Sequence, residues 1–277
     1  MTDDLWCEYS NLPSPAAYQL AADSGTITET EEMEQFTFYE VGGKIRDEIL
    51  GLESKDVDYV AVPYEILLAK YRSVDEIFDQ LVQYLQFEKF QIFLITPDCY
   101  TIRAKFPTGH KYQGVADFVM ARKEVGYIQG TRKPILKPGN LRDDLERRDF
   151  TLNAMAKGEN GKIIDYFNGM EDLKNGVLRT PLPFEITFQD DPLRILRAIR
   201  FSITKGFTIP EDMAEFIRNY DYEVFMAPVV SAERVREELF KCFKHDTHAT
   251  IMKLAEFPYL MDYIFRTKIW LKPTMEE

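Results

Sequence analysis

The sequence contains little cysteine and histidine, which argues against several kinds of protein. Among its 277 residues are 3 cysteines and 3 histidines. Cys7, Cys99 and Cys242 are odd in number and far apart, so they predict neither a disulfide framework nor a Cys-x-x-Cys zinc site. In "CFKHDTH", Cys242, His245 and His248 have metal-like spacing but lack a fourth ligand. We therefore interpret this stretch, which follows a helical pattern, as a helix end.

The sequence also lacks a long apolar run and a signal peptide. A membrane span needs about twenty consecutive apolar residues, and no such stretch or secretory leader is present. Hydrophobic residues make up 45% of the chain, enough to bury one large core or two smaller ones. We expect a cytoplasmic protein of one or two domains with no membrane partner.

Positive charge is absent from the first 35 residues. This stretch carries eight acids and no Lys or Arg, and its Pro, Ser, Ala and Thr follow no sustained period. We expect residues 1–35 to be an acidic extension that is poorly ordered or loosely docked. Without these eight carboxylates the net charge of −12 becomes −4 for residues 36–277. The overall acidity therefore does not exclude a nucleic-acid partner, whose phosphates require Lys and Arg.

Residues 36–160 have the pattern of a mixed α/β module. "FTFYEVGG" predicts a strand that runs into a glycine turn, "KIRDEILG" a short helix stopped by Gly51, and "DVDYVAV" a strand. "SVDEIFDQLVQYLQF" begins with Ser73 as a helix N-cap and has apolar residues at helical spacing. "FQIFLIT" and "GVADFVMARKE" return to strand character.

The second half of the chain predicts helices. "FTLNAMA", "DDPLRILRAIRF", "EDMAEFIRNY", "SAERVREELFKCF" and "HATIMKLAEF" all carry apolar residues three and four positions apart. We place the boundary after residue 160, within a range of about 150–185, because the intervening "KGENGKIIDYFNGMEDLKNG" is rich in turn residues. Residues 161–277 are thus expected to form a helical domain.

The stretch "YEVGGKIRDEILGLESKDVDYVAV" holds the residues best suited to phosphate chemistry. Gly42 and Gly43 lie between a strand and a helix, where backbone N–H groups can approach a phosphate and the helix start contributes partial positive charge. Arg46 lies on the first turn of that helix. A Gly-Gly turn alone is weak evidence for such a site.

Three carboxylates are candidate metal ligands. Asp56 and Asp58 alternate along one predicted strand and so share a face, and Asp117 on a neighbouring strand could complete a cage for hard divalent cations. Such a cage suits two Mg²⁺ ions about 4 Å apart, one activating an attacking hydroxyl and one neutralising a leaving pyrophosphate. An isolated Asp-x-Asp, in contrast, is usually a solvated strand edge.

The order of these motifs is more specific than any one of them. Strand, Gly-Gly, Arg-Asp and then Asp-x-Asp resembles the first signature of the class II tRNA nucleotidyltransferase and bacterial poly(A) polymerase family, within the polymerase-beta superfamily. The resemblance implies an α+β fold: a nucleotidyltransferase head with a small mixed β-sheet flanked by helices, followed by an all-α neck.

Three further stretches resemble motifs of this family in the right order. "DLERRDFTLNAMA" implies that Arg148 and Asp149 contact the ribose and phosphates of the incoming nucleotide, although Asp149 could instead cap the following helix. "DDPLRILRAIRF" resembles the family's template helix, and "SAERVREELFKCF" resembles the motif that braces it. On the template helix the implied nucleotide-binding residues are Asp191 and Arg194 at the base edge and Arg197 and Arg200 at phosphates.

The sequence departs from the family pattern in three ways. The acid pair that opens the template helix is Asp190-Asp191 rather than Glu-Asp, which shortens a side chain that orients the arginines. Lys44 follows Gly43 where the family more often has a small or apolar residue. The chain ends at Glu277, so most of the body and tail regions of full-length relatives would be missing.

The function implied by the resemblance is addition of CMP and AMP, from CTP and ATP, to an RNA 3′ end, most simply that of tRNA, with Mg²⁺ as cofactor. Alternatives within the family are A-adding, CC-adding or poly(A)-forming enzymes, on tRNA or another RNA. A non-catalytic RNA- or nucleotide-binding protein is the alternative from a different class. The paired acids argue against it, because a binding module has no reason to place carboxylates where phosphates approach.

Overall fold

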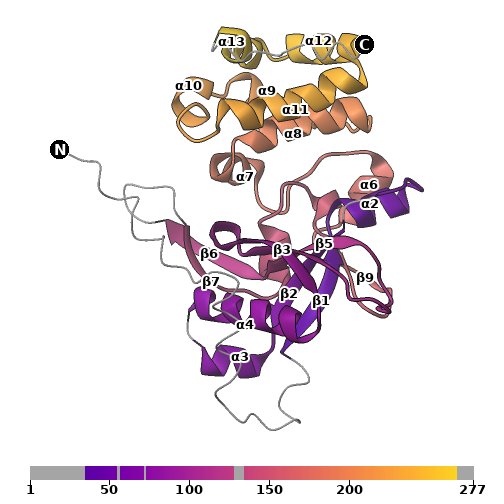
Figure 1. Ribbon diagram of the computed structural model, residues 1–277. Helices are drawn as coiled ribbons and strands as arrows, with labels where there is room; N and C mark the ends of the chain where they lie inside the picture. Colours follow the sequence, from indigo (N-terminus) through magenta and orange to yellow (C-terminus); the bar gives the residue numbers. More distant parts are fainter. Residues whose placement is uncertain (1–34, 55–56, 72, 128–133, 267–277) are drawn as a thin grey trace, which may run out of the picture.

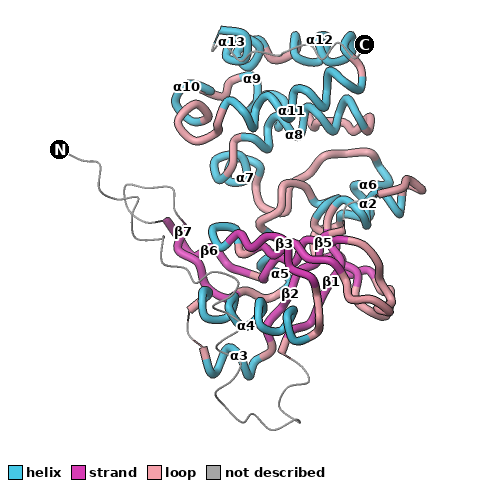
Figure 2. The backbone as a smooth tube through the Cα atoms, in the orientation of Figure 1, coloured by secondary structure: helices cyan, strands magenta, loops and turns pink. Residues whose placement is uncertain are grey.

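The protein consists of a sheet-containing head and a helical neck (Figure 1). The computed structural model describes residues 35–54, 57–71, 73–127 and 134–266. Within these ranges the chain first forms a mixed sheet with helices against it, and then continues as helices and loops (Figure 2). The predicted α+β fold class is confirmed. None of the described helices is both long and apolar enough to cross a membrane.

The main sheet of the head has seven strands in the order β3-β4-β5-β2-β1-β8-β9. Strands β2 and β5 pair in parallel, and the other neighbours are antiparallel. The strands are β1 (Phe36–Val41), β2 (Asp58–Pro63), β3 (Gln91–Thr96), β4 (Thr101–Lys105), β5 (Val115–Met120), β8 (Met155–Lys157) and β9 (Ile163–Asp165), and a separate pair is formed by β6 (Arg122–Tyr127) and β7 (Pro134–Pro138).

The strand register distributes side chains to two different faces of this sheet. Asp58 lies opposite Val41 on β1 and opposite Asp117 on β5, which in turn lies opposite Arg103 on β4. The next residue along β2, Tyr59, lies opposite Glu40 on β1. Because successive side chains of a strand point to opposite faces, the row through Asp58 and the row through Tyr59 face away from each other.

The face that carries Tyr59 is covered by α4 (Val74–Phe87) and contains the main core of the head. Apolar residues of α4 at helical spacing, among them Ile77, Leu81 and Leu85, are fully buried against this face. Ser73 caps the helix by accepting from Glu76 N–H, and the Glu76 carboxylate accepts from Ser73 N–H. This capping box confirms the N-cap predicted from the sequence.

Shorter helices complete the head. They are α2 (Gly43–Ile49), α3 (Glu65–Lys70), α5 (Leu141–Glu146) and α6 (Gly169–Asn175), together with the 3₁₀ turns η2 (Pro97–Cys99) and η3 (Thr151–Asn153). Of these, α2 follows β1 directly, so that the glycine turn joins the central part of the sheet to a helix.

The neck surrounds its own hydrophobic core, which contains Phe188, Leu196 and Leu239. The longest of its described helices, α8 and α11, pack against each other. Its helices are α7 (Phe184–Asp190), α8 (Leu193–Thr204), α9 (Glu211–Arg218), α10 (Tyr222–Phe225), α11 (Ala232–His245), α12 (Thr247–Ala255) and α13 (Pro258–Arg266). The stretch around Cys242 is a helix end as predicted, because α11 ends at His245.

One local prediction is wrong. "FTLNAMA" is not a helix of the second half: it forms the turn η3 and then β8, which pairs with β1 through Ala156 and Lys157. Its apolar spacing also suits burial in the head, where Phe150, Leu152 and Met155 are fully buried. Strand β9 lies beyond the predicted boundary at 160 yet belongs to the head sheet. We therefore place the boundary after Asn175, the end of α6, which contacts η3, and the division into domains stays a prediction.

Candidate active site

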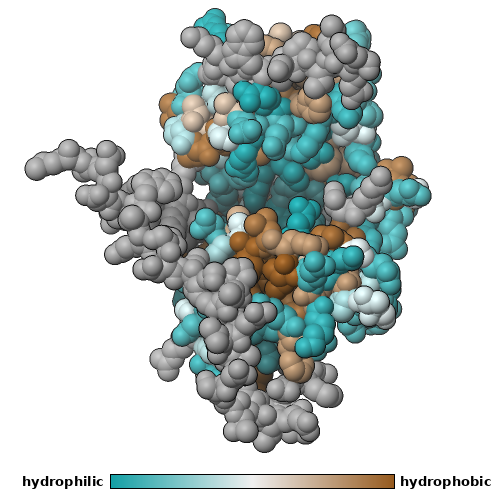
Figure 3. Space-filling model, viewed as in Figure 1, coloured by the Kyte–Doolittle hydropathy of each residue, from teal (hydrophilic) through white to brown (hydrophobic). Residues whose placement is uncertain are grey.

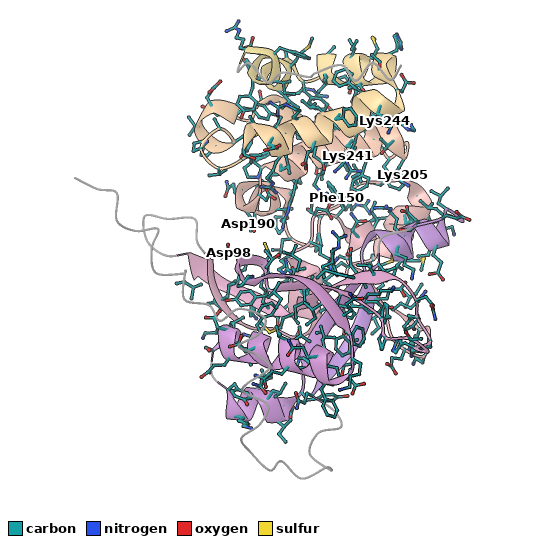
Figure 4. The ribbon with its side chains drawn as sticks, in the orientation of Figure 1. Asp98, Phe150, Asp190, Lys205, Lys241 and Lys244 are labelled. Carbon is teal, nitrogen blue, oxygen red and sulfur yellow. The ribbon has the colours of Figure 1, made fainter. Side chains whose placement is uncertain are left out.

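A pocket of about 290 Å³ lies where the head meets the neck. Figure 4 labels Phe150, Asp190 and Lys205 along this seam, and Figure 3 shows hydrophilic side chains along it. The pocket contains most of the predicted site residues together with several that were not predicted. It is lined by Gly42, Gly43, Lys44, Arg46, Asp47, Ser54, Asp58, Arg148, Asp149, Asn153, Arg197, Arg200 and Phe201.

The glycine turn at the start of α2 forms one wall of this pocket. Gly42 has φ 79°, a left-handed conformation that favours glycine. A Cβ at Gly42 would lie 3.3 Å from Arg148 Nη1 and 3.4 Å from Asp58 Oδ2. Because Gly42 has no side chain, the Arg148 guanidinium, just after α5, and the Asp58 carboxylate of β2 can both lie close to its backbone.

The predicted carboxylates are brought together as far as the structure describes them. Asp58 and Asp117 occupy opposite positions on parallel neighbours, although Asp117 does not line the pocket. Arg103 forms an ion pair with Asp117, with 3.3 Å between Nε and Oδ1. Asp56 lies outside the described residues.

These carboxylates suit a hard divalent cation, which prefers oxygen ligands. Asp58 and Asp117 contribute two such groups on one face of the sheet. In the part of the chain that the structure describes, no group of three acidic, histidine or cysteine side chains gathers closely enough to hold a metal ion. A complete cage would need a further oxygen ligand, and Asp56 stays the predicted candidate for it.

Arg148 is held in position by Asp144, a residue that sequence reasoning missed. Asp144 is fully buried and accepts from Arg148 Nη2 at 3.0 Å, and it also forms an ion pair with Arg147. Burial would raise the pKa of the Asp144 carboxyl, but the two guanidinium groups lower it below its usual value. The four-residue spacing between Asp144 and Arg148 on a helical turn was the available signal.

Asp149 links the head to α8, the helix that the sequence predicts to be the template helix. Its Oδ2 accepts from Arg197 Nε at 2.8 Å, and its Oδ1 accepts from Phe150 N at 2.8 Å and from Asn153 Nδ2 at 3.0 Å. Burial would raise the pKa of the Asp149 carboxyl, but Arg197 and these hydrogen bonds lower it to about 2. Asp149 is therefore ionised at neutral pH and fixes the position of Arg197.

Glu238 on α11 holds two arginines of α8. It is buried, and its Oε2 accepts from Arg200 Nε at 2.6 Å, while Oε1 lies 4.0 Å from Arg197 Nη1. Burial would raise the pKa of the Glu238 carboxyl, and Arg200, Lys241 and Arg197 together lower it. The sequence indicated that this stretch braces the template helix but did not single out Glu238.

Arg46 lines the pocket from a buried position that joins α2 to the rest of the site. Its guanidinium donates to both carboxylate oxygens of Asp47, at 3.0 and 2.8 Å, and to Asn153 Oδ1 at 2.7 Å. It also lies 5.1 Å from the centre of the Phe201 ring on α8. These contacts hold head and neck together, and the expected phosphate contact of Arg46 stays a prediction.

Asp191 and Arg194 do not line the pocket. Asp191 precedes α8 rather than lying on it, and accepts from Leu193 N and from Arg234 Nη2, the latter at 2.9 Å. Arg194 donates to the carbonyl oxygen of Arg147 at 2.6 Å, so it connects the neck to the head. Their proposed contact with the base of a nucleotide stays a prediction.

The pocket is positively charged within an acidic protein. Its lining includes five cationic side chains and three carboxylates, a net charge of +2, whereas the whole chain carries −12. A surplus of Lys and Arg around a glycine turn is suited to polyanionic ligands such as triphosphates. Lys44, noted in the sequence as a departure from the family, supplies one of these charges.

Comparison with known proteins identifies the family of this fold. Residues 38–179 match the Poly A polymerase head domain. A multifunctional CCA protein of Nitrosomonas europaea is 36% identical over 65% of this chain and 38% of its own length. The mitochondrial CCA tRNA nucleotidyltransferase of Saccharomyces cerevisiae is 34% identical over 84% of this chain and 43% of its own. The chain thus spans less than half the length of these curated relatives.

The fold also resembles solved structures. A crystal structure of a tRNA nucleotidyltransferase, complexed with a primer tRNA and an incoming ATP analog, superimposes with a TM-score of 0.60. It is 28% identical, and the match covers 85% of this chain and 60% of that one. The sequence match and the fold lead to the same conclusion: the chain belongs to the Poly A polymerase head domain family.

Proposed function

We propose that this protein is a tRNA nucleotidyltransferase that adds CMP and AMP, from CTP and ATP, to the 3′ end of tRNA. The observation that carries the proposal is the pocket at the seam of head and neck, where the Gly42 turn, the Asp58 carboxylate and a net positive charge meet. Relatives named for CCA addition, and a related structure that holds primer tRNA and an ATP analog, support the same chemistry.

The triphosphate of the nucleotide would lie against the glycine turn. Gly42 permits close approach of the backbone, and the cationic side chains of Lys44, Arg148, Arg197 and Arg200 would offset the negative charge of the phosphates. Asp144, Asp149 and Glu238 would keep these arginines in place, because each buried carboxylate already holds one or two of them. Asp149 thus acts through Arg197 as a positioning residue.

The transfer itself would occur at Asp58. The 3′-oxygen of the RNA forms a bond to the α-phosphorus, the bond from that phosphorus to the bridging oxygen breaks, and pyrophosphate leaves. Asp56, Asp58 and Asp117 would hold Mg²⁺, which when bound supplies charge neutralisation and activation of the attacking hydroxyl. Selection between bases is assigned to Asp191 and Arg194 at the start of the template helix.

The test is incorporation of labelled CTP and ATP into three tRNA transcripts: one without CCA, one lacking only the terminal A, and one complete. We expect the first to gain CCA, the second to gain A and the third to gain nothing. Sequencing of the products distinguishes this outcome from A-only, CC-only or poly(A) addition, and no incorporation into any transcript would refute the proposal.

We further expect Asp58→Ala to abolish incorporation, because its loss removes a ligand for the metal beside the reacting phosphate. The fold should survive, since the change removes one of two neighbouring acidic groups. Asp98→Ala, which removes an exposed carboxylate of the head, is the matched control. Incorporation and melting temperature are measured on both variants, and substantial activity of Asp58→Ala would show that this carboxylate is not catalytic.

A further inference from the structure

A second pocket lies on the opposite face of the head sheet from Asp58. It has a volume of about 130 Å³ and lies beside the C-terminal end of α4. The strand register builds its floor, because Tyr59, Glu40 and Lys157 are opposite one another on β2, β1 and β8. Asp58 and Tyr59 are adjacent in sequence, so their side chains point to opposite faces of the sheet. The same strands therefore form the floor of a pocket on each face.

Two buried polar atoms in this pocket lack hydrogen-bond partners among the described residues. They are Oε1 of Glu40, whose residue is 5% exposed, and the hydroxyl of Tyr59, whose residue is 6% exposed. Leaving such groups unpaired is unfavourable, and buried polar groups in folded proteins are nearly always bonded to protein, water or a ligand. Both atoms can therefore bond to a group that enters the pocket, either water or a ligand.

Glu40 Oε1 lacks a hydrogen-bond donor rather than a cation that neutralises its charge. Glu40 already has two cations nearby: its Oε2 lies 3.4 Å from Lys44 Nζ, and its Oε1 lies 3.6 Å from Lys157 Nζ. Burial and the neighbouring Glu40 raise the pKa of Tyr59, so its phenol keeps the proton at neutral pH. The pocket thus presents an acceptor on Glu40 and a hydroxyl that can donate, and this pair matches a neutral ligand.

The walls of the pocket are largely aromatic, with charged side chains also in the lining, and they fit one planar ring. A dry cavity of about 150 Å³ accommodates benzene, so a volume of about 130 Å³ corresponds to a single six-membered ring. The lining includes Phe38, Tyr84, Phe90, Phe106, Tyr112 and Phe118. Aromatic side chains of this kind stack on nucleobases, whose faces are all π-systems.

We propose that this pocket binds a pyrimidine base, with a base N–H donating to Glu40 Oε1 and the Tyr59 hydroxyl donating to an adjacent acceptor of the ring. Pyrimidines present a donor beside an acceptor on one edge, and a carboxylate is a usual acceptor for the cytosine amino group. Purines exceed the ring size. The base comes either from a free nucleoside or from a nucleotide of an RNA strand.

This site is separate from the candidate active site but physically connected to it. Lys44 lines the active-site pocket, and its ammonium pairs with Glu40, which lines the pyrimidine pocket. A base that takes up Glu40 Oε1 would therefore act on a carboxylate that is paired with a cation of the active-site pocket. The binding proposal itself does not depend on nucleotide transfer, because a nucleoside carries no phosphate for the active-site cations.

The test measures binding of cytidine, uridine and adenosine to the full chain by calorimetry, with and without saturating ATP, whose purine base is too large for the pocket. We expect saturable binding of the two pyrimidine nucleosides, little binding of adenosine, and no competition by ATP. A short oligocytidine in the same experiment distinguishes the two sources, because tighter binding than cytidine would assign the site to RNA and equal or weaker binding to free nucleoside. Absence of pyrimidine binding, or its displacement by ATP, would overturn the proposal.

Tyr59→Phe removes only the hydroxyl from this pocket. We expect at least a tenfold loss of cytidine affinity, with a melting temperature that is unchanged or higher, because the removed group has no partner among the described residues. Tyr259→Phe, at an exposed tyrosine of the neck, is the matched control. Cytidine affinity that is equal in wild type, Tyr59→Phe and the control would show that cytidine binds without the Tyr59 hydroxyl, and this result would overturn the assignment to this pocket.

Discussion

A side chain at Gly42 is unfavourable for two reasons: the backbone has a positive φ, and a Cβ would approach neighbouring side chains. We expect Gly42→Ala to destabilise the protein by about 1–3 kcal/mol, the cost of a sparsely populated backbone conformation, here φ 79° and ψ −144°. It should also lower incorporation by roughly a hundredfold, because small displacements of catalytic groups have effects of this size. The new Cβ would approach Arg148 Nη1 and Asp58 Oδ2. Gly51→Ala separates the two effects.

Gly51 has a similar φ of 69°, but a Cβ there would meet nothing within 4 Å. Gly51→Ala should therefore lose similar stability and keep its activity. Unfolding in denaturant gives the stability, and initial rates of incorporation give the activity. Equal activity losses in the two variants would contradict the steric argument at Gly42.

The Asp149 carboxylate makes stability depend on pH in the acidic range. Its pKa falls from 3.8 to about 2 in the folded protein, which corresponds to roughly 2 kcal/mol. A lowered pKa stabilises the fold above the unfolded value, and this contribution is lost as the pH falls from about 4 to 2. Asp149→Asn should therefore be less stable at pH 7 by about this amount and lose less stability over that interval.

The measurement is the free energy of unfolding of both proteins at several pH values. The wild type should retain part of its acid sensitivity in any case, because Asp144 and Glu238 also have lowered pKa values. Asp190→Asn, at an exposed carboxylate near the same seam, is the control for a general effect of charge. Parallel pH curves for wild type and Asp149→Asn would refute the assignment.

At the scale of elements, local sequence signals predicted which stretches form helices and strands better than which of these elements pair with each other. The Ser73 cap and the apolar spacing of α4 and α8 are properties of short stretches, and both predictions are confirmed. "FTLNAMA" was misread because its apolar spacing is compatible with a helix, whereas pairing of Lys157 and Ala156 with β1 makes its end a strand. Tertiary pairing overrides local pattern in such short segments.

The candidate site also shows that local motifs can be predicted from the sequence, whereas long-range contacts cannot. The glycine turn, Asp58, Arg148 and Asp149 were found because they belong to local motifs, and the structure brings them into one pocket. Glu238 was missed because the arginine that it holds most closely, Arg200, is 38 residues away in sequence. Nothing in a single sequence reveals a contact over that distance.

The pairing of α8 with α11 yields a prediction for Glu238. We expect Glu238→Gln to destabilise the neck by about 2 kcal/mol, because it leaves the half-buried Arg200 guanidinium without its carboxylate. It should also raise the KM for nucleotides about tenfold, the equivalent of about 1.4 kcal/mol of binding free energy. Arg200 would no longer be held toward the pocket, whereas Arg197 would keep its contact with Asp149.

Glu237→Gln is the matched control, since the neighbouring carboxylate is exposed on the same helix. Steady-state kinetics with CTP and ATP give KM and kcat for both variants, and thermal unfolding gives stability. A purely structural role of Glu238 would lower the amount of folded protein without a change in KM, and that result would contradict our interpretation.

At the scale of the whole molecule, the candidate active site is assembled from both parts of the chain. Arg197 of the neck pairs with Asp149 of the head, Arg194 donates to the backbone at Arg147, and Lys205 pairs with Asp47. Loss of the neck would remove the cations of α8 and leave Asp149 without its guanidinium. The head alone therefore cannot reproduce the charge of the pocket.

The distribution of charge over the chain gives the last prediction. Eight carboxylates precede residue 35 without any Lys or Arg, and their removal changes the net charge from −12 to −4. Residues 1–34 lie outside the described residues, so the expectation rests on charge alone. A chain that begins at Gln35 should bind RNA more tightly than the full chain at low salt, because fewer like charges oppose the phosphates.

This advantage should shrink as salt rises, since charges are screened over about 8 Å at physiological ionic strength. A full-length variant with the eight acids replaced by Asn and Gln distinguishes charge from length: it should bind RNA as the shortened chain does. If residues 1–35 instead cover an apolar surface through Leu5, Trp6, Tyr9 and Tyr18, shortening would lower the melting temperature and leave RNA affinity unchanged. Affinity and melting temperature at two salt concentrations separate these outcomes, because only electrostatic repulsion makes the gain in affinity depend on salt.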